Sequence, residues 1–70
     1  MKQNGFGNRV KELRLSKGWS QQELADRCGC WQSAISAIEV ERRGATLYMM
    51  VKLADQLEVT TDYLLTGRNG

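Results

Sequence analysis

Residues Ser20–Glu39 read SQQELADRCGCWQSAISAIE, and they are the most informative part of the chain. It contains two short helical patterns that meet at Gly29, a residue type that commonly ends helices because it tolerates a left-handed backbone. Ser20 is a typical N-cap for the first pattern, and Glu23, three residues later, completes a capping box. The second pattern starts near Trp31 and has an apolar face opposite a face of small, uncharged side chains. The stretch therefore predicts two helices packed across a tight turn.

The helical spacing continues on both sides of this stretch, and no segment alternates as a strand would. We expect a first helix that begins near Phe6 and is ended by Gly18. Thr46 and Thr60 are the expected N-caps of a fourth and a fifth helix. The side chains expected on the inner faces are Phe6, Val10, Leu13 and Lys17 in the first helix, Leu24, Ala25 and Cys28 in the second, Ala34, Ile35 and Ile38 in the third, and Leu47, Met50, Val51, Ala54 and Leu57 in the fourth.

Seventy residues suffice for one small domain, which we assign to residues 1–70 with an ordered core at about 6–67. The predicted fold class is all-α, a compact bundle of five helices with a helix-turn-helix over about residues 20–40. No apolar run approaches the roughly 18 residues that would span a membrane. The N-terminal sequence MKQNGFGNRV lacks the apolar stretch of a signal peptide, so we expect the protein to stay in the cytoplasm.

Basic residues are concentrated in the first part of the chain, although the net charge is only +2. Residues 1–45 contain eight basic and five acidic side chains, whereas residues 46–70 contain two basic and three acidic ones. The basic bias therefore lies on the part of the chain that includes the two central helices. Such a bias suits a polyanionic partner.

Side chains that carry out catalysis or hold metal ions are scarce. The chain has no histidine, no glycine loop that would cradle phosphates and no carboxylate cluster suited to a metal. We therefore expect neither an enzyme nor a bound cofactor, metal or small-molecule ligand. Cys28 and Cys30 alone cannot complete a tetrahedral zinc site. We expect both to be small apolar core residues on either side of the turn, with a redox-responsive role as the alternative.

In this layout the chain resembles the helix-turn-helix domain of the lambdoid phage repressor and Cro family, which many small bacterial regulators share. The resemblance covers about residues 6–67 and rests on four segments in the same order. These segments are SQQELADRCG at Ser20–Gly29, AISAIE at Ala34–Glu39, LADQLEV at Leu53–Val59 and DYLLTG at Asp62–Gly67. The resemblance implies that the third helix enters the major groove of DNA. It also implies a buried or half-buried ion pair between Arg14 and Glu39 that fixes the position of this helix.

The free face of the third helix supplies the candidate base-reading residues. Glutamine pairs bidentately with adenine in the major groove, serine donates or accepts hydrogen bonds, and an alanine methyl can meet a thymine methyl. An ordinary exposed helix would carry lysine or glutamate, whereas residues 31–38 have no charge. The candidate base contacts are Gln32, Ser33, Ser36 and Ala37. The candidate phosphate contacts are Gln21, Trp31, Arg42, Arg43 and, as weaker candidates, Asn8 and Arg9.

Three features depart from the family pattern. Trp31 occupies the usual Ser/Thr cap position of the third helix, where it could pack against the sugar-phosphate backbone, touch a base or lie back on the protein. Glu41 replaces a glycine that is common after this helix, which places a negative charge near the expected DNA backbone. Tyr48 and Met49 stand at positions that the family usually makes polar, so we expect an apolar outer surface at the start of the fourth helix.

The expected function is sequence-specific binding of double-stranded DNA by a transcriptional regulator, with a repressor as the leading type. A restriction-modification controller or an antitoxin would share the same body. One domain covers half a site, so we expect a homodimer on a palindromic operator, with its recognition helices about 34 Å apart. The expected interface residues are Val59, Tyr63 and Leu64. The alternative is a protein-interaction module of the same fold with little DNA affinity, which Glu41 and the Tyr48–Met49 pair would suit.

Overall fold

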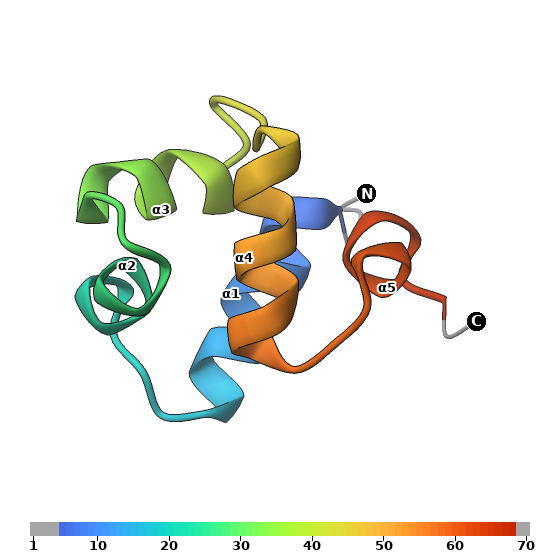
Figure 1. Ribbon diagram of the computed structural model, residues 1–70, viewed down its shortest axis with the longest axis horizontal. Helices are drawn as coiled ribbons and strands as arrows, with labels where there is room; N and C mark the ends of the chain where they lie inside the picture. Colours follow the sequence, from blue (N-terminus) through green and yellow to red (C-terminus); the bar gives the residue numbers. More distant parts are fainter. Residues whose placement is uncertain (1–4, 69–70) are drawn as a thin grey trace.

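The computed structural model describes residues 5–68, which form five helices and no strand. The helices are α1 (Phe6–Ser16), α2 (Gln21–Cys28), α3 (Gln32–Glu39), α4 (Leu47–Leu57) and α5 (Thr61–Thr66). In Figure 1, α4 crosses in front of α1, with α2 and α3 on one side of this pair and α5 on the other. The predicted all-α, five-helix fold is confirmed. Residues 1–4 and 69–70 of the predicted domain lie outside the described residues.

Hydroxyl side chains cap three of the helices at the predicted positions. Ser20, Thr46 and Thr60 each accept a hydrogen bond from the backbone N–H three residues along, at 3.0, 3.1 and 3.0 Å. These bonds satisfy N–H groups that have no partner within the helix. The carboxylate of Glu23 does not complete the expected capping box, because it pairs with Arg27 one turn further on, at 2.8 Å.

One apolar core joins the five helices, and its fully buried large side chains are Val10, Leu24, Ile35, Leu53, Leu57 and Leu64. Burying each such side chain contributes about 1.5–3 kcal/mol before the entropy cost of folding. The prediction for α4 was wrong in part, since Leu47 and Val51 are 80% and 52% exposed. Residues 47–51 are apolar on every side, so the sequence pattern does not fix which side of this turn faces the core. Phe6, Leu13 and Ala34 are half-buried rather than buried.

Gly7 allows the start of α1 to approach the end of α3 closely. A Cβ atom on Gly7 would lie 2.5 Å from the carbonyl oxygen of Glu39 and 2.7 Å from Cγ of Glu41, and it would also meet the carbonyl of Ile38. The backbone N–H of Gly7 donates to the carboxylate of Glu41 at 2.8 Å. Glu41 has a left-handed φ of 58°, which is the conformation that favours glycine at this position.

The Glu41 carboxylate therefore lies at the N-terminus of α1, where the helix dipole favours a negative charge. This contact accounts for an acidic residue directly after α3.

None of the helices within residues 5–68 could cross a bilayer, since the longest have only 11 residues.

Candidate nucleic-acid interface

One side of α3 faces away from the core and is called its free face, whereas the opposite side holds the helix in place. Ile35 and Ile38 hold the opposite side in the core, with exposed fractions of 0% and 2%. The predicted base-reading residues all lie on the side away from the core: Gln32 and Ser33 are exposed, and Ser36 and Ala37 are half-buried. Val40, which the sequence interpretation left out, continues this face at the C-terminal end of the helix and is 64% exposed. Its spacing of three and four residues from Ala37 and Ser36 was the signal that could have identified it.

A chain of hydrogen bonds ties the side chain of Gln32 to the protein interior. Gln32 Nε2 donates to Oε1 of Gln21 at 2.7 Å, and Gln21 Nε2 donates to Oε1 of Glu39 at 3.0 Å. Arg14 then binds Glu39 through two hydrogen bonds, Nε to Oε2 at 2.7 Å and Nη2 to Oε1 at 3.1 Å. Its third donor reaches the carbonyl oxygen of Trp19 at 2.8 Å. The predicted ion pair is thus present, and its side chains are only 8% and 2% exposed.

The chemistry of this chain fixes the direction in which each amide points. A carboxylate only accepts hydrogen bonds, so Gln21 must present its NH2 group to Glu39 and its oxygen to Gln32. Gln32 must in turn donate one of its two N–H groups to Gln21. One N–H donor and the amide oxygen of Gln32 remain available on the exposed side. In the major groove, an adenine base presents an acceptor and a donor that match these two groups of Gln32.

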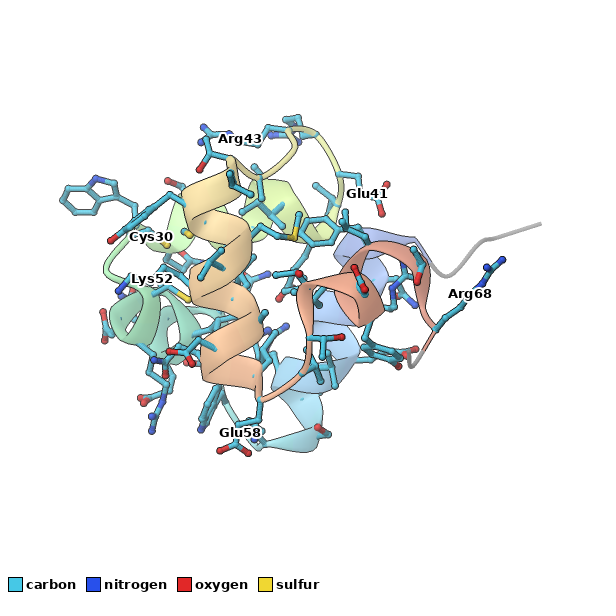
Figure 2. The ribbon with its side chains drawn as sticks, turned by 45° about the vertical axis from the view of Figure 1, so that its right-hand side comes forward. Cys30, Glu41, Arg43, Lys52, Glu58 and Arg68 are labelled. Atoms are coloured by element: carbon cyan, nitrogen blue, oxygen red, sulfur yellow. The ribbon has the colours of Figure 1, made fainter. Side chains whose placement is uncertain are left out.

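Basic side chains lie beside this face in the loop between α3 and α4. Arg42 and Arg43 are both exposed, and neither is engaged in an ion pair within residues 5–68. Figure 2 shows Arg43 at the end of the molecule where this loop passes from α3 to α4. Two adjacent exposed guanidinium groups next to an uncharged helix face suit contacts to a phosphate backbone.

The two weaker phosphate candidates, Asn8 and Arg9, lie on α1, and Arg9 has a structural role. Arg9 Nε and Nη2 donate to the carbonyl oxygens of Leu64 and Leu65, each at 2.8 Å, and thereby tie α5 to α1. Asn8 donates to Glu12 at 3.3 Å on the surface of the same helix. We therefore do not include Arg9 among the residues of the interface, and Asn8 remains a prediction.

Trp31 points away from the protein at the N-terminal end of α3. Its exposed fraction is 82%, and no side-chain hydrogen bond caps the helix at this residue. Of the three placements considered for this ring, lying back on the protein is therefore wrong. An exposed indole beside Gln32 remains available to a partner of α3.

The C-terminal residues suggested for a dimer interface differ in their accessibility. Leu64 is fully buried in the core, so its assignment to an interface was wrong. α5 has only six residues, which is too short for the helical spacing of its apolar side chains to distinguish an inward from an outward residue. Val59 and Tyr63 are half-buried, which leaves part of each side chain accessible.

Both cysteines are free thiols near the turn between α2 and α3. Cys28 is 3% exposed in the core and Cys30 is half-buried against it, as expected from the sequence. Burial raises the pKa of Cys28 to about 11, with a further increase from the charge of the Cys30 thiolate and a decrease from Lys52. Burial also raises the pKa of Cys30. Both thiols are therefore protonated at neutral pH and are poor nucleophiles.

Known proteins match the chain over most of its length. A helix-turn-helix family model matches residues 10–64. The chain is 40% identical over 62 residues to the SPbeta prophage-derived HTH-type transcriptional regulator YonR of Bacillus subtilis, a match that covers 89% of this chain and 57% of that protein. The chain spans about half the length of the curated relatives that it matches.

Solved structures of a repressor and of a controller protein share the same fold. The P22 c2 repressor in complex with a synthetic operator has a TM-score of 0.90 and 27% sequence identity, and the match covers 96% of this chain and 100% of that one. The restriction-modification controller protein C.AhdI from Aeromonas hydrophila has a TM-score of 0.81 and 37% identity, over 86% and 91% of the two chains. The matches in sequence and the matches in structure therefore point to the same kind of protein.

Proposed function

The chain belongs to the Cro/C1-type helix-turn-helix family, and we propose that it binds double-stranded DNA at a specific sequence and represses transcription there. The single observation that carries the proposal is the free face of α3, which is uncharged and includes an amide held at a fixed orientation. The P22 c2 repressor, which shares the fold, is a repressor solved with operator DNA. We also propose a cytoplasmic location, because a protein that binds DNA must share its compartment.

Base reading is assigned to Gln32, Ser33, Ser36 and Ala37. The remaining donor and acceptor of Gln32 match N7 and the N6 amino group of adenine, so we propose adenine as the base that it reads. Ser33 and Ser36 would add hydrogen bonds from their short side chains, and Ala37 would contact a thymine methyl. This assignment makes the amide of Gln32 the main determinant of sequence preference.

Phosphate contacts are assigned to the two edges of this face. Arg42 and Arg43 follow α3, and their charges are free to meet the DNA backbone. On the other edge, α2 begins at Gln21, where backbone N–H groups and the positive end of the helix dipole favour a phosphate oxygen. The exposed ring of Trp31 would pack against the sugar-phosphate backbone. Such contacts set orientation and supply affinity without sequence information.

Replacing Gln32 by alanine should lower affinity for the preferred site by about 1–3 kcal/mol and abolish the preference at one base pair. Binding to random duplex should remain unchanged. Fluorescence anisotropy with both duplexes measures the two effects. Gln22→Ala is a matched control, because Gln22 is an exposed amide of α2 that bonds only Asp26, at 2.8 Å. An equal loss on both duplexes for Gln32→Ala would show that this residue does not read a base.

Replacing Arg43 by alanine should instead weaken binding to all sequences alike. Each phosphate contact releases a condensed counterion, so the slope of log K against log salt should become less steep by about 0.9. Arg68→Ala removes the same charge beyond α5, far from Arg43 in Figure 2, and should leave the slope unchanged. Equal slopes for the two variants would remove Arg43 from the interface.

We also propose a homodimer on a palindromic operator, because one helix-turn-helix domain covers only half a site. A single α3 reads one half-site, and two copies would place their α3 helices in successive turns of the major groove about 34 Å apart. The accessible parts of Val59 and Tyr63 are the proposed contacts between the two copies. Sedimentation of the protein with an operator duplex would detect two chains per duplex.

A protein-interaction module with little DNA affinity is the second candidate function. The observation in its favour is the exposed apolar surface at the start of α4, where Leu47 and Tyr48 are 80% and 71% exposed. An anisotropy titration against random duplex at low salt separates the two functions. Absence of binding at micromolar protein would favour the interaction module.

A further inference from the structure

A cavity of about 290 Å³ opens to solvent between the end of α2, the inner side of α3 and the start of α4. Figure 2 shows two of its lining residues, Cys30 and Arg43, near the start of α4. The side chains of its inner wall are apolar, namely those of Cys28, Ala34, Ile38, Ala45 and Met49. A concave apolar wall with few polar groups at its rim suits an apolar occupant.

The indole of Trp31 lies next to this cavity along the chain without entering it. Trp31 follows Cys30, which lines the cavity, but Trp31 is not part of the wall and is 82% exposed. A tryptophan in a core or an interface buries about 150–250 Å² of surface, which this indole leaves in water. Each chain therefore presents a large apolar side chain beside an apolar cavity.

The cavity suits an indole in size and in chemistry. Pockets of about 300–1,000 Å³ bind drug-sized ligands, so a cavity near the lower end of this range has room for one bicyclic ring. Arg43 lines the cavity and is exposed, and it is not engaged in an ion pair within residues 5–68. A guanidinium group is attracted to the face of a tryptophan ring more than to that of any other aromatic side chain.

We propose that two copies of this chain associate by exchanging Trp31, so that each indole enters the cavity of the other copy. Because the indole and the cavity are neighbours on each chain, a single twofold axis brings both indoles to both cavities. The two indoles and the walls that they cover would bury about 600–1,000 Å² in total. A stable interface buries about 1,200–2,000 Å², so this association is weak and forms only at high protein concentration.

The exchange would cover Trp31 and Arg43, both of which the proposed function assigns to phosphate contacts. Self-association and DNA binding would then exclude each other, and a DNA duplex would separate the two copies. This consequence rests on the proposed function. The association itself is measured without DNA, so that each of the two ideas can fail separately.

The test is sedimentation velocity of the full 70-residue chain from micromolar to millimolar concentration, together with the fluorescence of Trp31. Trp19→Phe leaves Trp31 as the one remaining tryptophan, since the chain has two. We expect a shift from one chain to two as the concentration rises. The emission of Trp31 should move to shorter wavelength over the same range, because the indole leaves water.

Two substitutions remove one half of the contact each. Trp31→Ala should weaken the association by at least about tenfold, as truncation of an interface tryptophan commonly does. Leu15→Ala is its control, because Leu15 is a large apolar side chain of α1 that is 54% exposed. Gly44→Leu should have the same effect as Trp31→Ala, because Gly44 lines the cavity and a Cβ there has no neighbour within 4 Å, which leaves room for a side chain that fills it.

Gly44→Ala is the matched control for the filled cavity and should associate as the unmodified chain does. Circular dichroism verifies that each variant is folded. Association that persists in Trp31→Ala or in Gly44→Leu would overturn the exchange, and a dimer through Val59 and Tyr63 would give this result. Short-wavelength emission at every concentration from a single chain would also overturn it, because the indole would then occupy the cavity of its own chain.

Discussion

Replacing Arg14 by methionine should destabilise the fold by about 3–5 kcal/mol, because the carboxylate of Glu39 would remain buried without its cation. The two side chains are 8% and 2% exposed and share two hydrogen bonds. Within residues 5–68, no buried side-chain nitrogen or oxygen lacks a hydrogen-bond partner, so the substitution would introduce the first one. Urea unfolding followed by circular dichroism measures the loss.

An exposed ion pair provides the control for this experiment. Arg27→Met removes the partner of Glu23, whose pair is 42% and 43% exposed, and should cost less than about 1 kcal/mol from the pair itself. The double variant Arg14→Met with Glu39→Leu should recover most of the stability, since no charge remains buried. It should not recover sequence preference, because Gln21 would lose the carboxylate that orients it and Gln32. Full stability of Arg14→Met alone would contradict a buried pair.

Replacing Gly7 by alanine should cost about 3 kcal/mol, at the upper end for overpacking. The added Cβ would meet the carbonyl oxygens of Ile38 and Glu39, which are backbone atoms that cannot rotate away. The start of α1 would have to move from the end of α3, and the bond from the Gly7 N–H to Glu41 would break. The midpoint of thermal unfolding reports the loss.

Gly44→Ala is the matched substitution for Gly7→Ala. A Cβ on Gly44 would have no neighbour within 4 Å, so its stability should change by less than about 0.5 kcal/mol. If the two alanine variants unfold at the same temperature, the close approach of α1 to α3 is not present in solution.

Local signals in the sequence predicted the helices well, and distant contacts explain what they missed. Ser20, Thr46 and Thr60 act within one turn of their own helices, so their roles are visible in the sequence. Gly7 and Glu41 are 34 residues apart, and nothing in either local pattern links them. The same holds for Arg9, whose partners are the carbonyls of α5.

Periodicity fails where a segment is apolar on every side or very short. The five residues from Leu47 to Val51 fit several helical faces, and the structure buries Met50 while exposing Leu47. In the six-residue α5, the sequence did not show that Leu64 faces inward. Along the candidate interface, the sequence predicted which residues lie on the free face of α3. The sequence did not predict the hydrogen bond from Gln32 to Gln21, because two neutral amide side chains form no sequence pattern that would indicate a contact between them.

The most direct test of DNA reading by α3 is selection from a library of random duplexes, carried out in parallel with the unmodified chain and with Gln32→Ala. We expect the unmodified chain to enrich a short inverted repeat with adenine at one position of each half-site, and the variant to lose the preference at that position alone. Enrichment of no common sequence, or of the same sequence by both proteins, would contradict the account.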